Sequence, residues 1–344
     1  MEKYIVNGHF LRKARITGVQ RFAIELLNEL DKIVEPGIIS IAIEKGTNAP
    51  DYKNIKIITV GSLRNHLWEQ ISYPLYALKK NYIPLNLCNA SPILFPGVIC
   101  IHDIKVKRHP EQFRLPFVMW YRIQYFLNIP RAKRILTVSE FSKHEICSAY
   151  HVEENKISVI YNAWNHFEKV KADNAIEKKL NLSPGNYFFY VGSMDPTKNM
   201  DWILGEAEHN SSEVFVITGA YNKRIFRFIE KHIPSNVIMT GFLKDEEIKA
   251  LMSDCKAFLF PSTYEGFGIP PLEALSAGAP NLVLSGIDVL NEVYGEGFEY
   301  IDPHNNWMNL SHVNKADDAV RKGVLDKYSW KKSAEKLLYT LMSV

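Results

Sequence analysis

The sequence predicts an α/β protein built from two doubly wound domains, and three observations support this fold class. The chain has 344 residues, which exceeds the usual size of a single domain. Short β-branched runs alternate with longer amphipathic segments, as in parallel sheets that are covered by helices. A polar, lysine-rich segment at 166–186 separates two such series. We therefore expect domains at 1–165 and 166–327 that face one another across a cleft, followed by a terminal helix at 328–344.

In the first series, apolar runs of strand length alternate with stretches whose apolar residues recur every three or four positions. The expected strands are 4–6, 38–43, 55–60, 98–101, 135–138 and 157–160. The expected helices are 19–33, 67–80, 117–127 and 140–150.

The second series begins after a linker, which we expect at 166–186 together with a short helix. The expected strands are 187–191, 214–218, 237–240, 257–261, 281–284 and 298–301, with helices between them. The last stretch, 328–342, has the three- and four-residue spacing of an amphipathic helix that packs on a core. Its apolar residues are Trp330, Ala334, Leu337, Leu338 and Leu341.

Composition excludes several classes of protein. Hydrophobic residues make up 47% and charged residues 23%, as in a globular protein with a large core. The apolar runs are far shorter than the roughly 20 residues that span a bilayer. The first residues do not have the pattern of a signal peptide, so we expect a cytoplasmic protein. The 4 cysteines are widely spaced and are expected to be reduced thiols.

The charge is unevenly distributed along the chain. Residues 1–165 contain 22 Lys and Arg against 14 Asp and Glu, although the whole chain has a formal net charge of only +3. A basic first domain either attracts an anionic membrane or carries scattered solubilising charge, and the sequence leaves both interpretations open. Nucleic-acid-binding motifs are absent, so we expect no nucleic-acid partner.

The segment 258–280 is the most informative about chemistry. A buried strand leads into a turn with Gly266 and Gly268, two prolines open a helix, and Gly278 closes it. The free N–H groups and the dipole at the start of such a helix favour a phosphate. The glycines allow a ligand to approach the main chain closely.

Two carboxylates flank this turn. Glu265 precedes the glycines and Glu273 lies in the first part of the helix. Carboxylates accept hydrogen bonds from hydroxyl groups. A ligand with a phosphate between two polyhydroxy groups, such as a nucleotide sugar, would therefore fit this turn and its two carboxylates. Alternatively, Glu273 only complements the helix dipole and Glu265 is a solvated loop residue.

The segment 265–273 resembles the E-x7-E signature of glycosyltransferase family 4. Its members are retaining enzymes with the GT-B fold, which consists of two Rossmann-like domains. Further strings match the family in the same order along the chain: 17–22, 101–104, 109–111, 137–143, 159–162, 190–192, 196–199 and 329–330. The resemblance therefore covers essentially the whole chain. It extends to bacterial enzymes that assemble capsule, O-antigen or exopolysaccharide repeat units.

The resemblance implies a donor site in the second domain. Glu265 would face the donor sugar, Glu273 would hold the ribose hydroxyls, and Lys198 would neutralise the pyrophosphate. Main-chain amides would lie beside the sugar and phosphate at Gly266, Phe267, Gly268 and Ile269.

One position departs from the family pattern. Many members have an arginine directly after the glycine that ends the first strand of this domain, but here Ser193 follows Gly192. Either Lys198 acts with helix N-termini alone, or Lys223 or Arg224 supplies the second cation. We favour the second alternative, because one cation stabilises a leaving diphosphate poorly.

In the first domain, the resemblance places His102 near the donor sugar and Gly18 close to the donor phosphate and the acceptor. His102 follows a buried strand, where α/β sheets carry functional groups. We therefore expect His102 to hydrogen-bond the sugar, not to act as a strong base. Asp103 either orients His102 or caps the next segment.

The expected activity is retaining transfer of a sugar from a nucleoside diphosphate, with GDP-mannose favoured, to a lipid-linked oligosaccharide at the inner membrane face. No metal or cofactor is expected, because the sequence contains no D-x-D triplet and no H-E-x-x-H. Pro271 stands where a dinucleotide fingerprint needs a glycine, which argues against a dehydrogenase. The alternatives are a nucleotide-sugar-binding scaffold without catalysis, and an enzyme that hydrolyses, phosphorolyses or epimerises its sugar.

Overall fold

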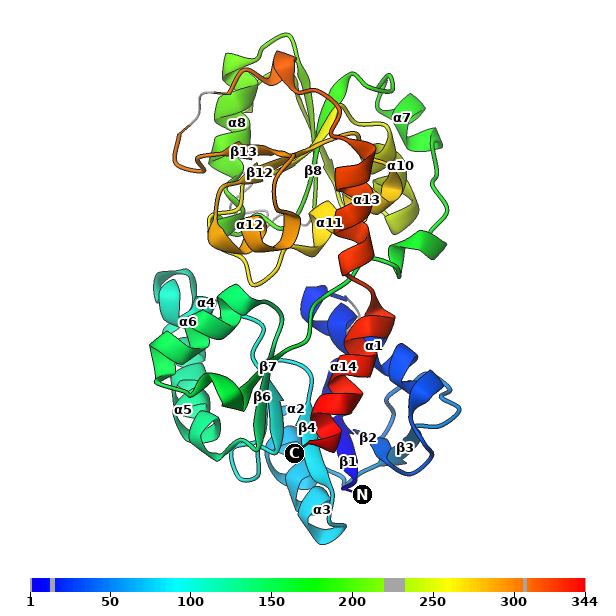
Figure 1. Ribbon diagram of the computed structural model, residues 1–344, viewed down its shortest axis with the longest axis vertical. Helices are drawn as coiled ribbons and strands as arrows, with labels where there is room; N and C mark the ends of the chain where they lie inside the picture. Colours follow the sequence, from blue (N-terminus) through cyan, green and yellow to red (C-terminus); the bar gives the residue numbers. More distant parts are fainter. Residues whose placement is uncertain (1, 13–15, 220–232, 306–307, 344) are drawn as a thin grey trace. The chain divides into compact units, whose positions relative to one another are not determined.

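The computed structural model describes residues 2–12, 16–219, 233–305 and 308–343, and it consists of two compact units (Figure 1). Unit 1 comprises residues 1–162 and 330–344, and unit 2 comprises residues 163–329. The chain thus changes units after Asn162, a few residues before the boundary expected from the sequence. The last helix, expected as a separate segment, belongs to unit 1.

Unit 1 contains a parallel sheet of seven strands in the order β3-β2-β1-β4-β5-β6-β7. Its strands are β1 Tyr4–Asn7, β2 Ile39–Ile43, β3 Lys56–Thr59, β4 Ile83–Asn86, β5 Val98–Cys100, β6 Arg134–Thr137 and β7 Ile157–Val159. The central strands are fully buried, because helices cover both faces of the sheet, as parallel sheets require.

The helices of unit 1 are distributed over the two faces of its sheet. They are α1 Gly18–Ile33, α2 Asn65–Leu67, α3 Tyr73–Lys79, α4 Lys105–Arg108, α5 Leu115–Arg131, α6 Glu140–Tyr150 and α14 Trp330–Met342. Figure 1 shows α5 and α6 on one side of the sheet and α1 and α14 on the other.

The terminal helix α14 packs on α1. Its buried residues include Trp330, Leu337 and Leu341, in the spacing that the sequence predicted. The Trp330 ring lies 6.2 Å from the Phe22 ring of α1. The end of the chain thus completes the core of the unit in which the chain began.

Unit 2 contains a parallel sheet of six strands in the order β10-β9-β8-β11-β12-β13. Its strands are β8 Tyr187–Val191, β9 Val214–Thr218, β10 Val237–Gly241, β11 Ala257–Phe260, β12 Leu282–Ser285 and β13 Glu299–Ile301. Its described helices are α7 Ala175–Lys179, α8 Met200–His209, α10 Asp245–Ser253, α11 Ile269–Ala277, α12 Asp288–Tyr294 and α13 Asp318–Lys327.

Three elements differ from the sequence-based expectations. Strand β4 was not predicted, because Pro84 lacks an N–H and interior strands usually exclude proline. The expected helix 67–80 contains a π-helical turn, Trp68–Ser72, which ends two residues before Pro74. The expected helix 328–342 begins only at Trp330, and a separate helix, α13, precedes it.

No helix in the described part of the chain combines the length and the apolar character that crossing a membrane requires.

The packing of α14 on unit 1 predicts that Leu337→Ala lowers the free energy of unfolding by about 2 to 5 kcal/mol, because Leu337 is fully buried. Urea titration followed by circular dichroism measures this loss. Tyr339→Ala is the matched control, since Tyr339 lies on the same helix and is 75% exposed. Equal losses in the two variants would contradict the packing of this helix face.

Candidate functional site

The predicted donor residues of unit 2 follow two neighbouring strands at the centre of its sheet. Gly192 and Ser193 come directly after β8, and the turn with Glu265 comes after β11. Strands β8 and β11 pair in parallel. Because parallel strands end at the same edge of a sheet, the two loops lie side by side at the position where α/β sheets bind ligands.

The turn that carries Lys198 is held at both ends. The Asp195 carboxylate accepts hydrogen bonds from the Thr197 backbone N–H at 3.1 Å and from its hydroxyl at 2.9 Å. Asn199 adopts a left-handed conformation, and its side-chain amide donates to the Pro261 carbonyl at 3.1 Å. The Lys198 backbone is therefore anchored to the end of β11.

Lys198 and Glu265, which are 67 positions apart, form an ion pair. The side chains are only 22% and 13% exposed, and the Lys198 ammonium lies 5.4 Å from the centre of the Phe260 ring. Partial burial beside an aromatic ring reduces solvent screening of this pair. The structure thus brings together two of the residues that the sequence placed at the donor site.

Helix α11 begins at the turn that follows Glu265. Gly268 caps the helix with a φ of 92°, and the Tyr294 hydroxyl donates a hydrogen bond to its carbonyl. The Phe267 side chain is buried, with its ring 5.3 Å from that of Tyr328. The Phe267 side chain therefore faces the core, so a ligand could contact this residue only through its main chain.

The loops after β8 and β9 are in close contact. Gly219 has a φ of 151°, and a Cβ at this position would overlap the Gly192 carbonyl oxygen. The Tyr190 hydroxyl donates to the Ser193 carbonyl at 3.4 Å. Burial raises the pKa of Tyr190 far above its usual range, and the charge of Glu265 adds to this effect. Tyr190 is thus a neutral support beneath the loop.

Glu273 has a partner that the sequence analysis did not identify. One carboxylate oxygen of Glu273 lies 2.9 Å from Nε2 of His166, whose side chain is only 4% exposed. His166 was assigned to the linker, and no local pattern distinguishes it from other linker residues. Since a carboxylate has two oxygens, the contact with His166 fixes Glu273 and leaves acceptor capacity on the second oxygen.

His102 lies two residues after β5 in unit 1 and is 5% exposed. Its Nε2 is 2.9 Å from the Leu87 carbonyl oxygen, and its backbone N–H donates to the Asn89 side chain at 2.9 Å. The ring packs edge-on against Phe22 of α1 at 4.8 Å. The structure thus positions this ring through three contacts.

Burial lowers the pKa of His102 to about 4, although the hydrogen bond to Leu87 opposes this effect. Since a carbonyl can only accept, Nε2 carries the proton and Nδ1 is the acceptor. The ring is therefore neutral near pH 7, in agreement with the expectation that it is not a strong base.

The other predicted site residues are separate from these contacts. Gly18 is the exposed first residue of α1, next to a capping box between Thr17 and Gln20. Lys223 and Arg224, the candidates for a second cation, lie outside the described residues.

A small hollow of about 50 Å³, lined by polar and apolar residues, lies at the carboxyl ends of β1 and β4 in unit 1. The Asn7 amide donates to the Glu69 carboxylate at 2.9 Å, and Glu69 is only 3% exposed. Asn86 lines the same hollow. The sequence analysis missed these residues, because β4 was not predicted and Glu69 lies within an ordinary helical pattern.

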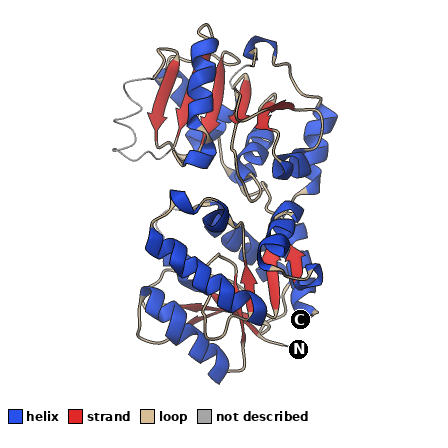
Figure 2. Ribbon diagram, turned by 90° about the vertical axis from the view of Figure 1, so that its left-hand side faces the viewer, coloured by secondary structure: helices blue, strands red, loops and turns tan. Residues whose placement is uncertain are grey.

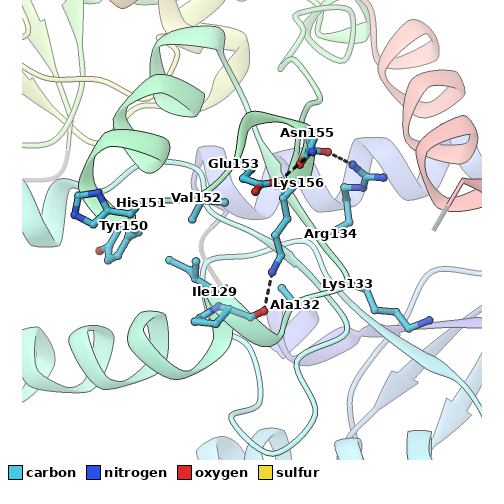
Figure 3. A pocket seen from close by; sticks show the side chains of 11 residues that line it. Ile129, Ala132, Lys133, Arg134, Tyr150, His151, Val152, Glu153, Asn155 and Lys156 are labelled. Carbon is cyan, nitrogen blue, oxygen red and sulfur yellow. Dashed lines mark hydrogen bonds between the residues drawn. The ribbon is translucent and has the colours of Figure 1, made fainter.

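A larger hollow of about 790 Å³ lies at the other end of the strands of this sheet, beside the amino ends of β6 and β7 (Figure 3). The Lys156 ammonium donates to the Pro130 carbonyl at 2.7 Å, and Arg134 donates to the Asn155 carbonyl. Burial lowers the pKa of Lys156. Lys156 thus satisfies a backbone carbonyl near the end of α5, and Arg134 satisfies one in the turn before β7, which are structural roles.

Within the described residues, no three His, Cys, Asp or Glu side chains come together so as to hold a metal ion.

The burial of His102 predicts a specific dependence of stability on pH. The unfolded chain binds a proton at this residue near pH 6.5, whereas the folded chain does so only near pH 4. Lowering the pH from about 7.5 to about 5 should therefore reduce the free energy of unfolding of the wild type by about 2 kcal/mol more than that of the His102→Gln variant. Urea titrations across this range measure the difference, and parallel curves would contradict a buried neutral ring.

Two family signatures match the chain. The family described as "Glycosyl transferases group 1" matches residues 172–322, and "Glycosyltransferase Family 4" matches residues 91–166. The two matches are adjacent and span most of the chain between residues 91 and 322.

Two curated relatives have similar sequences. "O-antigen chain mannosyltransferase RfbU" from Salmonella typhimurium is 30% identical over 239 residues, which are 67% of this chain and 64% of that protein. "O-antigen chain mannosyltransferase B" from Escherichia coli is 28% identical over 240 residues, which are 66% of this chain and 63% of that protein. The chain thus spans slightly less than two thirds of the length of either relative.

Solved structures with the same fold cover the whole chain. Sucrose-phosphate synthase from Thermosynechococcus elongatus has a TM-score of 0.74 at 14% identity, covering 99% of both chains. Anabaena HepE in complex with UDP-glucose has a TM-score of 0.74 at 14% identity, covering 100% of both chains. The two parallel sheets, the matching family signatures and the E-x7-E segment identify the chain as a member of glycosyltransferase family 4 with the GT-B fold.

Proposed function

We propose that the protein is a retaining glycosyltransferase that moves a sugar from a nucleoside diphosphate donor to a hydroxyl of a growing, lipid-linked surface polysaccharide. The observation that carries this proposal is the ion pair of Lys198 and Glu265 beside the start of α11. A cation and free backbone N–H groups suit a diphosphate, and carboxylates suit sugar hydroxyls. These are the two chemical parts of a nucleotide sugar.

In this proposal, catalysis consists of positioning and electrostatic stabilisation. Lys198 and the main-chain N–H groups of the turn from Gly266 to Ile269 stabilise the charge that develops on the leaving diphosphate. The acceptor hydroxyl attacks the anomeric carbon from the face that the diphosphate leaves, so that the new glycosidic bond forms as the bond to the diphosphate breaks, and the hydroxyl proton passes to the departing diphosphate oxygen. Retention then needs no covalent sugar intermediate and no nucleophile from the protein.

Two further residues orient the donor in the proposed complex. Glu273, fixed by His166, accepts hydrogen bonds from the ribose hydroxyls. His102 accepts a hydrogen bond from a sugar hydroxyl at Nδ1, because Nε2 already donates to Leu87. A neutral ring performs this role across the physiological pH range.

The acceptor is proposed to bind unit 1. The buried polar side chains Asn7 and Glu69 at the carboxyl ends of β1 and β4 are suited to a hydrogen bond with one sugar hydroxyl, since their hollow of about 50 Å³ has room for such a group and not for a whole sugar. Two relatives that are named O-antigen mannosyltransferases support a glycan acceptor and a mannosyl donor. HepE was solved with UDP-glucose, so UDP is tested beside GDP.

The place of action is proposed to be the cytoplasm, with peripheral contact to the inner face of the cytoplasmic membrane. A lipid-linked acceptor lies in that membrane, and the first 165 residues carry an excess of positive charge.

Donor binding is tested by thermal-shift measurements with GDP-, UDP-, dTDP- and CMP-linked sugars. A ligand at about 100 times its dissociation constant should add about 2.7 kcal/mol to the stability of the protein. We expect one nucleotide class to stabilise the wild type and Glu273→Ala to lose most of this gain. Equal stabilisation of both proteins would contradict the role of Glu273, and no stabilisation by any donor would contradict the proposed function.

Lys198→Ala should lower turnover about 100- to 1000-fold, because it removes the cation that faces the leaving diphosphate. Transfer of radiolabelled sugar to membrane-extracted acceptor measures this loss. Lys256→Ala is the matched control, since the pair of Lys256 and Glu213 is similarly buried, with 23% and 16% exposure, and lies at the opposite end of β11. Similar losses in both variants would show a stability effect. Product formation without acceptor would indicate hydrolysis.

A further inference from the structure

The outward face of α5 is apolar. Leu115, Met119, Ile123 and Phe126 recur at spacings of three and four, which places them on one face of the helix. Their exposed fractions are 71%, 45%, 45% and 77%. Single exposed apolar residues are common on protein surfaces, but four large ones in register on one helix are unusual.

The segment from α2 to α3 repeats this arrangement. Leu67, Ile71, Leu75 and Leu78 are exposed by 60%, 43%, 50% and 44%, at the same spacings of four, four and three. The buried face of this segment contains Trp68, Tyr73 and Ala77, so the helix is apolar on both sides. Packing within unit 1 explains only one of these two faces.

The two helices flank the same loop. The Gln70 side chain accepts a hydrogen bond from the Ile93 backbone N–H at 2.9 Å, and the Asn128 side chain donates to the Ser91 hydroxyl at 2.9 Å. Leu94, in this loop, is 58% exposed. The exposed side chains of both helices and Leu94 therefore form one surface, which is called the apolar surface below.

Sheet topology agrees with this placement. The segment from α2 to α3 connects β3 to β4, and α5 connects β5 to β6, in the same direction along the sheet. Right-handed crossovers place both connections on the same face. Figure 2 views the molecule from the side on which Figure 1 shows α5, with helices of unit 1 in front of strands.

The exposed charged residues of these two helices are basic. Arg122 lies on α5, Arg114 immediately precedes it, and Lys79 and Lys80 lie at the end of α3; all four are exposed. No acidic residue occurs at 112–139, nor at 70–102. The acidic residue of the α2–α3 segment, Glu69, is buried and bonded to Asn7. Exposed apolar groups on helices whose exposed charged residues are all cationic are typical of membrane-surface helices.

We propose that the apolar surface docks on an anionic lipid bilayer, with α5 parallel to the membrane plane. This inference deepens the proposed function, because a lipid-linked acceptor is presented in the same plane. The apolar side chains enter the boundary between headgroups and acyl chains, and Arg114, Arg122, Lys79 and Lys80 face anionic headgroups. A second copy of the chain is a poorer occupant, because a symmetric contact would bring these basic residues together.

The test is sedimentation of the full chain with vesicles of phosphatidylcholine, alone or with about one third phosphatidylglycerol. We expect binding to the anionic vesicles that weakens at high salt. The double variant Ile123→Ser, Phe126→Ser should lower the partition coefficient at least about tenfold. Tyr339→Ser is the matched control, since Tyr339 is 75% exposed, about as much as Phe126, but lies on α14, and it should bind like the wild type.

Charge is tested separately from apolar contact. Arg114→Gln with Arg122→Gln should reduce the preference for anionic over neutral vesicles. Thermal melting and the thermal shift with nucleotide sugar show that each variant is folded. No binding to anionic vesicles at low salt, or equal losses in the Ile123/Phe126 and Tyr339 variants, would overturn the proposal.

Self-association gives a different result. If the apolar surface mediates dimers, sedimentation velocity will show concentration-dependent association that the Ile123/Phe126 variant abolishes, without vesicle binding. That outcome would also overturn membrane docking. A failure of the proposed function would be recognised separately. In that case nucleotide sugars would not stabilise the wild type, whereas its binding to vesicles would be unchanged.

Discussion

The candidate donor site depends on the parallel pairing of β8 with β11. Both strands end at the same edge of the sheet, so the turns that follow them meet although they are far apart in the chain. Asn199 and Pro261 connect these turns through a hydrogen bond, and Lys198 and Glu265 then form their ion pair. A change that separated the two strands would disrupt the cation, the carboxylate and the start of α11 together.

Residues behind the predicted site fix its geometry. His166 holds Glu273, Asp195 holds the turn of Lys198, and Tyr190 supports the loop after β8. These supporting groups are buried or partly buried, and they leave the polar atoms of the site little freedom to reorganise. Such preorganisation is what electrostatic stabilisation of a leaving group requires.

Unit 1 combines two different environments. At the carboxyl end of β5, burial keeps the His102 ring neutral and fixed by Leu87 and Phe22. On the outer side of α5, large apolar side chains remain exposed, and the exposed charged residues of this helix are basic. The first environment suits hydrogen bonding to a sugar hydroxyl, whereas the second suits contact with lipid. In the proposed function, the same unit thus serves both the donor sugar, at His102, and the membrane that presents the acceptor.

The sequence by itself determined the two-sheet architecture and the strand–turn–helix that contains Glu265 and Glu273, because periodicity and glycine positions are local signals. It could not reveal β4, since buried parallel pairing outweighs the strand-breaking tendency of Pro84. Only the tertiary structure decided that His166 contacts Glu273 and that α14 packs on α1. Such contacts join distant segments, and no local pattern records which distant side chain becomes a neighbour.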